Sequence, residues 1–92
     1  MTTFTVKFAV YGALNGGDEN KTQAIDVSGS LQKNLVANNG IVTIDNATFG
    51  TDPSTGNTKH FGALVTVNGT DQYFACEENQ TIDFCHSMTP DK

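Results

Sequence analysis

The chain has 92 residues, of which 37% are hydrophobic and 16% charged, and this is enough for one small globular domain. Its net charge is −5 and its five basic residues are all lysine, so we expect neither nucleic acid nor a membrane surface as a partner. No apolar run reaches the roughly 18–20 residues of a membrane span and no signal peptide is visible, so we expect a cytoplasmic protein, or one secreted without a visible signal peptide.

The first predicted element is a strand over residues 3–12, which read TFTVKFAVYG. Apolar and polar side chains alternate there with the period of two that a strand with one buried face shows. The alternation predicts that Tyr11 points away from the core. The residues that it predicts to face the core are Phe4, Val6, Phe8 and Val10.

The middle of the chain changes from the period of a strand to that of a helix and back. We predict a turn-rich loop, a second strand, one short helix and a third strand, at residues 15–21, 23–27, 28–40 and 41–45. The prediction of a helix rests on Leu31, Leu35 and Val36, which stand at helical spacing. A serine at its start can cap it, and Asn39-Gly40 can end it.

The strongest local signal is Asn68-Gly69, because this pair accepts the positive φ angles of a two-residue type I′ hairpin turn. The turn sets the register of strands predicted at 60–67 and 70–76, and it places Tyr73 opposite Leu64 on the face away from the core. A last strand at 80–84 completes the chain. Its apolar residues face the core if a three-residue turn precedes it, closed by Asn79 in the left-handed conformation.

Together these elements predict an all-β fold, namely a small antiparallel β-sandwich of about six strands with one short helix between strands 2 and 3. We expect a single domain over residues 1–85 and a flexible tail over residues 86–92. The alternative is an α+β roll in which the helix covers a single sheet.

Four stretches also form a recognisable succession: FAVYGA, AIDV, GIVTIDNATFGTDPSTGNTKHFGALVTVNG and CEENQTIDF, which together cover most of the chain. This succession resembles the small β-domain of unknown function found at the C-terminal end of some DnaJ-like cochaperones and in stand-alone microbial and fungal proteins. The resemblance implies a β-domain and transfers no catalytic residue. No J-domain signature is present, so it implies no cochaperone activity.

The longest polar stretch, FGTDPSTGNTKHFG, spans Phe49–Gly62 and lacks the spacing of a phosphate-binding loop or of a calcium-binding loop. Its Asp, Pro and Gly residues predict a connecting loop with local hydrogen bonds. The alternative is a loop that contacts a ligand through Asp52, Asn57 or Lys59.

Cys76 and Cys85 carry the only thiols in the sequence. The predicted register turns Cys76 inward and Cys85 outward, which disfavours a disulfide unless the last strand belongs to the other sheet. His60 lies on the face opposite Cys76, so the pair does not form a nucleophile and base. The spacing of cysteines and histidines also lacks a zinc-binding unit. We therefore expect no catalytic residue, no metal and no cofactor, and hence not an enzyme.

The outer face of the predicted hairpin is the best candidate site, because an aromatic ring lies there among small and polar side chains. We predict a non-enzymatic binding module and favour lectin-like carbohydrate binding, through Tyr73, Asp71, His60, Glu77 and Asn57. The alternative is a protein-interaction or self-assembling domain without a small ligand, whose homodimer face consists of Leu64, Tyr73, Gly62 and Ala75. The expected partner is thus a carbohydrate or a protein, including a second copy of the chain.

Overall fold

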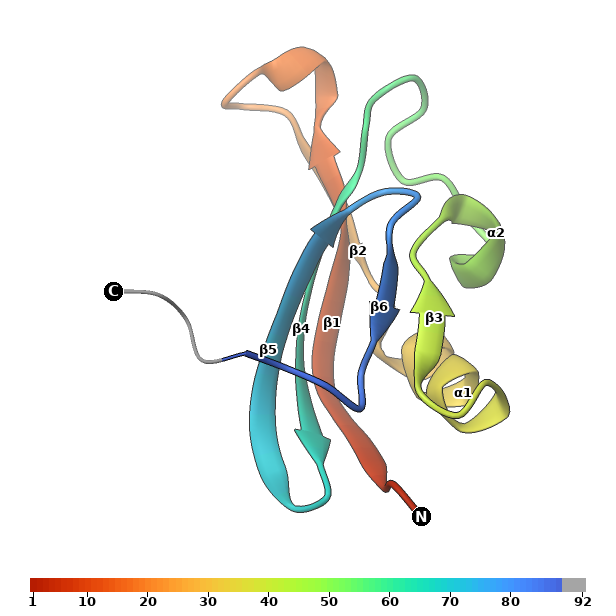
Figure 1. Cartoon of the computed structure of the whole chain (residues 1–92). Helices are drawn as coiled ribbons and strands as arrows, with labels where there is room; N and C mark the ends of the chain where they lie inside the picture. The colour runs from red at the N-terminus through yellow and green to blue at the C-terminus, as the bar shows by residue number, and fades with distance from the viewer. Residues whose placement is uncertain (89–92) are drawn as a thin grey trace.

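The computed structural model describes residues 1–88, which form two antiparallel sheets and two helices (Figure 1). The larger sheet has the strand order β2-β1-β4-β5, and the smaller one pairs β3 with β6. The elements are β1 (Phe4–Leu14), the 3-10 turn η1 (Asn15–Gly17), β2 (Thr22–Asp26), α1 (Ser28–Ala37), β3 (Ile41–Thr43), α2 (Asn46–Phe49), β4 (His60–Val67), β5 (Thr70–Glu77) and β6 (Thr81–Asp83). The predicted small all-β fold, with a helix between the second and third strands, is confirmed.

The β4–β5 hairpin has the register that its turn predicts. Asn68 and Gly69 adopt φ angles of 50° and 84°, as a type I′ turn requires. Leu64 stands opposite Tyr73, and Phe61 stands opposite Cys76. The Asn68 side chain also accepts a hydrogen bond from the backbone N–H of Thr3, at 2.9 Å, which ties the turn to the start of the chain.

The first strand differs from its prediction because a β-bulge at Lys7 interrupts its pairing with β4. The register passes from Val6 opposite Val65 directly to Phe8 opposite Leu64, so Lys7 has no partner of its own. An inserted residue reverses the side-chain alternation beyond it.

The reversal exchanges the two faces of β1 after the bulge. Ala9 and Tyr11 are 2% and 0% exposed, whereas Phe8 and Val10 are 50% and 42% exposed. The predictions that Phe8 and Val10 face the core and that Tyr11 faces away are therefore wrong.

The core lies between the larger sheet and a layer made of α1 and the β3–β6 ribbon (Figure 1). Leu31 and Leu35 of α1 are fully buried, as their spacing predicts, whereas Val36 is 67% exposed. Aromatic rings form a continuous row through the core, with centroid distances between 4.5 and 6.4 Å, in the order Tyr11, Phe49, Phe61, Phe84 and Phe74. The row links β1, α2, β4, β5 and the residue after β6, so these elements depend on one another for their burial.

The predicted serine does not cap α1, because the residue at its N-cap position is Val27, which makes no side-chain hydrogen bond to the helix. The Asp26 carboxylate accepts a hydrogen bond from the N–H of Ser28, at 2.8 Å, at the start of α1. Asp45 accepts from the N–H of Thr48, also at 2.8 Å, and caps α2, which the sequence did not predict. Gly40 has a φ of 89°, and a Cβ there would lie 2.6 Å from the Phe4 ring, so any other residue at this position would be strained and would displace that ring.

The last strand belongs to the smaller sheet. Asn79 has a φ of 73°, as predicted for the turn before it, but β6 then pairs with β3 and not with β5.

Cys76 and Cys85 are both free thiols, so no disulfide joins them. The expected tail at 86–92 lies partly outside the described residues. Among residues 1–88, no helix has both the length and the apolar character of a membrane span.

Phe84→Ala should lower the free energy of unfolding by about 3–5 kcal/mol, because Phe84 contacts the rings of both Phe61 and Phe74 in the core. Phe8→Ala should cost less than about 1 kcal/mol, because half of the Phe8 side chain is already in solvent. A urea titration of both variants measures the difference. Equal losses would show that Phe8 belongs to the core after all.

Candidate functional site

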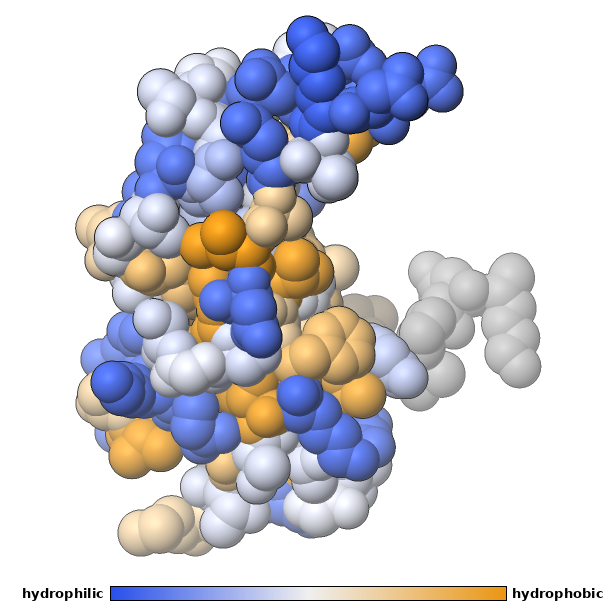
Figure 2. All heavy atoms as spheres, turned by 180° about the vertical axis from the view of Figure 1, so that it is seen from behind, coloured by the Kyte–Doolittle hydropathy of each residue, from blue (hydrophilic) through white to orange (hydrophobic). Residues whose placement is uncertain are grey.

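We define the outer face as the surface of the larger sheet that points away from α1 and the β3–β6 ribbon. The register aligns two apolar rows across it, Phe8–Leu64–Tyr73 and Val10–Gly62–Ala75. Tyr73 is the most exposed ring on this face, at 77%. Figure 2 shows apolar patches in the middle of the molecule, with hydrophilic side chains between them, below the hydrophilic loop that joins β1 to β2.

Polar side chains border the apolar rows at both ends of the strands. At one end, the Asp71 carboxylate accepts a hydrogen bond from the Thr66 hydroxyl at 2.6 Å. It also forms a salt bridge with the Lys7 ammonium at 3.0 Å. These two donors hold the pKa of Asp71 below its usual value, the Thr66 bond being the larger cause. At the other end, His60 stands opposite Glu77.

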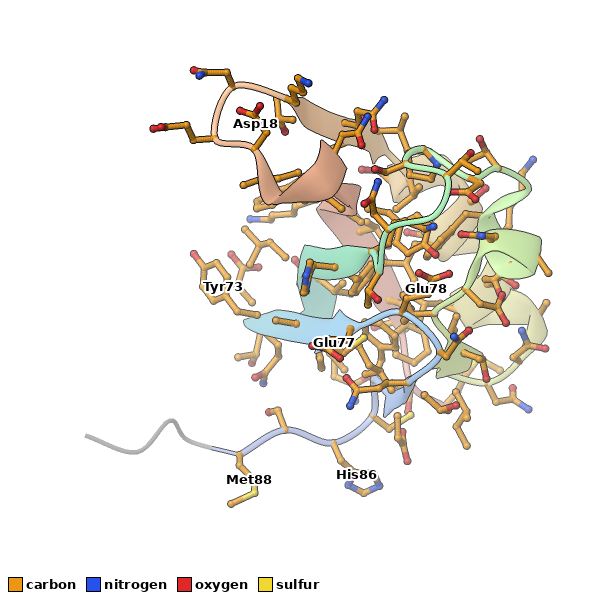
Figure 3. The ribbon with its side chains drawn as sticks, turned by 90° about the horizontal axis from the view of Figure 1, so that it is seen from above. Asp18, Tyr73, Glu77, Glu78, His86 and Met88 are labelled. Carbon is orange, nitrogen blue, oxygen red and sulfur yellow. The ribbon has the colours of Figure 1, made fainter. Side chains whose placement is uncertain are left out.

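The structure thus brings most of the sequence-predicted site residues to one surface. The carbohydrate candidates Tyr73, Asp71, His60 and Glu77 all lie on the outer face, and so do the dimer-face candidates Leu64, Gly62 and Ala75. Figure 3 shows Tyr73 projecting away from the body of the molecule, whereas Glu78 points to the inner side.

Asn57, the fifth carbohydrate candidate, lies in a loop and not on the outer face. Its side-chain amide donates to the Ser54 hydroxyl at 2.8 Å, and its carbonyl oxygen accepts from the N–H of Gly16 at 3.2 Å. It therefore connects the two loops at one end of the sheet. Sequence reasoning missed Phe8 and Val10 as members of the outer face, because only the bulge places them there.

A second polar cluster lies inside the molecule around Lys59. The Lys59 side chain is 3% exposed, and its ammonium lies 2.8 Å from Asp52, 3.5 Å from Glu78 and 3.2 Å from the carbonyl oxygen of Ser54. Asp52 is the main cause of a raised pKa for Lys59, and the pKa of Asp52 is lowered in turn. Lys59 is thus held charged inside the fold.

The neighbouring Tyr11 belongs to the same interior. Its hydroxyl donates to the side-chain oxygen of Asn46 at 2.7 Å. Burial, followed by the negative charge of Glu78, raises the pKa of Tyr11 to about 12. Within residues 1–88, every buried side-chain nitrogen and oxygen has a hydrogen-bond partner. The cluster is therefore internally satisfied, and it fixes the 50–59 loop against the β5–β6 turn.

The expectation that the 50–59 loop is a connection agrees with these contacts. Asp52, Asn57 and Lys59, the three candidates for ligand contact, direct their polar atoms to neighbouring parts of the chain. In the part of the chain that the structure describes, no three His, Cys, Asp or Glu side chains gather as a metal site would require.

Comparison with known proteins found no matching family model, no matching curated protein and no matching solved structure. The resemblance to the β-domain of DnaJ-like cochaperones therefore stays a prediction.

Lys59→Met should remove part of the acid sensitivity of the fold. The pKa of Asp52 is lowered in the folded state, so the stability that the pair contributes is present above the ordinary carboxyl pKa and is lost as the pH falls through the lowered value. The difference in free energy of unfolding between wild type and variant should thus shrink between about pH 5 and about pH 2. Denaturant titrations across that range measure it, with the exposed Lys33→Met as control. A constant difference would contradict the assigned pairing.

Cys85 should react with a thiol reagent in the native protein at least about tenfold faster than Cys76, because Cys85 is exposed and burial raises the pKa of the Cys76 thiol. Cys76→Ser and Cys85→Ser variants assign each rate. Both thiols should react at once in denaturant without prior reduction. A requirement for reductant would contradict the free thiols.

Proposed function

We propose that the chain is a non-enzymatic binding module whose working surface is the outer face, and that a second copy of the chain is its partner. The observation that carries the proposal is the pair of apolar rows, Phe8–Leu64–Tyr73 and Val10–Gly62–Ala75, on one face of the larger sheet. Contiguous apolar surface of this kind is uncommon on monomeric proteins and typical of interaction sites.

The shape of the outer face supports association with another sheet. Gly62 and Ala75 form a low strip beside the rings of Phe8 and Tyr73, so a partner surface can approach closely there. Two sheets pack at about 10 Å when their facing side chains interdigitate. A two-fold axis brings the same patch of both copies together, and this is the commonest symmetry of soluble oligomers.

The charges on this face support the proposal as well. Lys7 and Asp71 flank the Tyr73 row and pair with each other at 3.0 Å. Their charges largely cancel locally, so burying the neighbouring rings leaves no isolated charge in the interface.

Sedimentation equilibrium of the wild type should fit a monomer–dimer equilibrium. Phe8→Ala and Tyr73→Ala should each raise its dissociation constant at least about tenfold, because each removes an exposed ring from the contact. Val36→Ala, which removes an equally exposed apolar side chain from α1, is the control and should leave the equilibrium unchanged. A wild type that stays monomeric up to about 1 mM would overturn the proposal.

A glycan array tests the carbohydrate candidate, which the ring of Tyr73 on the same face as Asp71 and Glu77 supports. An exposed ring can cover the C–H face of a sugar while carboxylates orient its hydroxyl groups. A monomeric wild type that binds a defined glycan on an array, with binding lost in Tyr73→Ala and retained in Val36→Ala, would favour the lectin-like function instead.

A further inference from the structure

The free edge of β5 is a second surface that the association through the outer face does not use. β5 pairs with β4 on one side and, among residues 1–88, with no strand on the other. Backbone groups in an antiparallel pair alternate between the two sides of each strand. Because Val67 and Thr70 flank the two-residue turn as a bonded pair, the N–H and C=O groups of Asp71, Tyr73, Ala75 and Glu77 point to the free side.

Only the last of these four residues has local partners. The N–H of Glu77 donates to the side chain of Gln80 at 2.8 Å, and its carbonyl accepts from the N–H of Gln80 at 3.3 Å. For Asp71, Tyr73 and Ala75, no hydrogen bond of these backbone groups occurs within the described chain. The edge carries no proline or bulge that would block the addition of another strand.

A groove lies beside the Ala75 end of this edge. Its volume is about 480 Å³, and its walls are Ala75 and Cys76 of β5, Thr81–Asp83 of β6 and His86–Met88. The Ser87 hydroxyl donates to the side chain of Gln72 at 2.8 Å, which holds the far wall near β5. Figure 3 shows His86 and Met88 on this segment, beyond the side of β5 that faces away from β4.

We propose that an extended, basic peptide segment binds here by adding to β5 as a further strand of the larger sheet. In this mode, backbone hydrogen bonds supply the affinity and alternate side chains supply the specificity. The three unpaired residues of β5 offer one N–H and one C=O each.

The outer-face side chains of β5 define the sequence that fits. They alternate as acid, aromatic, small and acid at Asp71, Tyr73, Ala75 and Glu77. The Asp71 carboxylate already pairs with Lys7 at 3.0 Å, so Glu77 is the acid that a cationic side chain would face. A strand paired with them places every second residue beside one of these positions, and opposite charges in directly opposed positions are favourable. The matching segment therefore has Lys or Arg at the end that lies opposite Glu77, which is its first or its seventh position depending on strand direction, and apolar residues at its third and fifth positions. The net charge of −5 attracts such a segment from a distance.

The test uses the acetylated and amidated peptide Lys-Thr-Val-Thr-Val-Thr-Lys and the full chain, followed by heteronuclear NMR. Saturable shifts should appear at the backbone amides of Asp71, Tyr73 and Ala75. The same peptide N-methylated at its third and fifth residues, which cannot donate there, should bind at least about tenfold more weakly. So should the peptide with Glu in place of both Lys residues.

Two variants of the protein complete the test. Ala75→Pro removes an edge N–H and leaves the β4–β5 hydrogen bonds in place, so it should abolish the shifts while the far-UV circular dichroism stays native. Phe8→Ala weakens the proposed self-association but should change peptide affinity less than twofold, so the two proposals fail separately. Absence of saturable shifts at these amides, or equal binding of the N-methylated peptide, would overturn the strand-addition site.

Discussion

The β-bulge at Lys7 is the constraint on which both faces of the larger sheet depend. By giving Lys7 no partner on β4, it reverses the side-chain alternation of β1 and turns Tyr11 into the core. The same reversal moves Phe8 and Val10 to the outer face. Without it, the aromatic row would lose its first ring, and the outer face would lose the apolar side chains that make it a candidate for association.

The buried ammonium of Lys59 is a second constraint, because it holds separate segments of the chain together. Burying an ammonium is unfavourable unless carboxylates and carbonyls compensate for lost water, and Asp52, Glu78 and Ser54 do so. The arrangement connects a long loop to the turn before β6. The polar residues of that loop thus have a structural use, and the two partner surfaces that we propose lie elsewhere, on the outer face and at the free edge of β5.

These two surfaces differ in the physics that they offer. The outer face offers apolar area, and the hydrophobic stabilisation from burying it does not depend on direction. The edge of β5 offers unpaired backbone donors and acceptors, which are directional and require an extended partner. Tyr73 belongs to both, because its ring lies on the face and its backbone lies at the edge. A strand added to β5 would therefore widen the outer face rather than cover it.

The sequence by itself determined the features that rest on local chemistry. Asn68-Gly69 sets the hairpin turn and hence the register that puts Tyr73 on the outer face. The helical spacing of Leu31 and Leu35 places α1 against the core. Only the tertiary structure decided the features that rest on distant partners. Residues 8–11 are apolar on both faces of the strand, so alternation alone cannot reveal the bulge; the pairing of β1 with β4 locates it. The partners of Lys59 are likewise separated in sequence and meet only when the chain is folded.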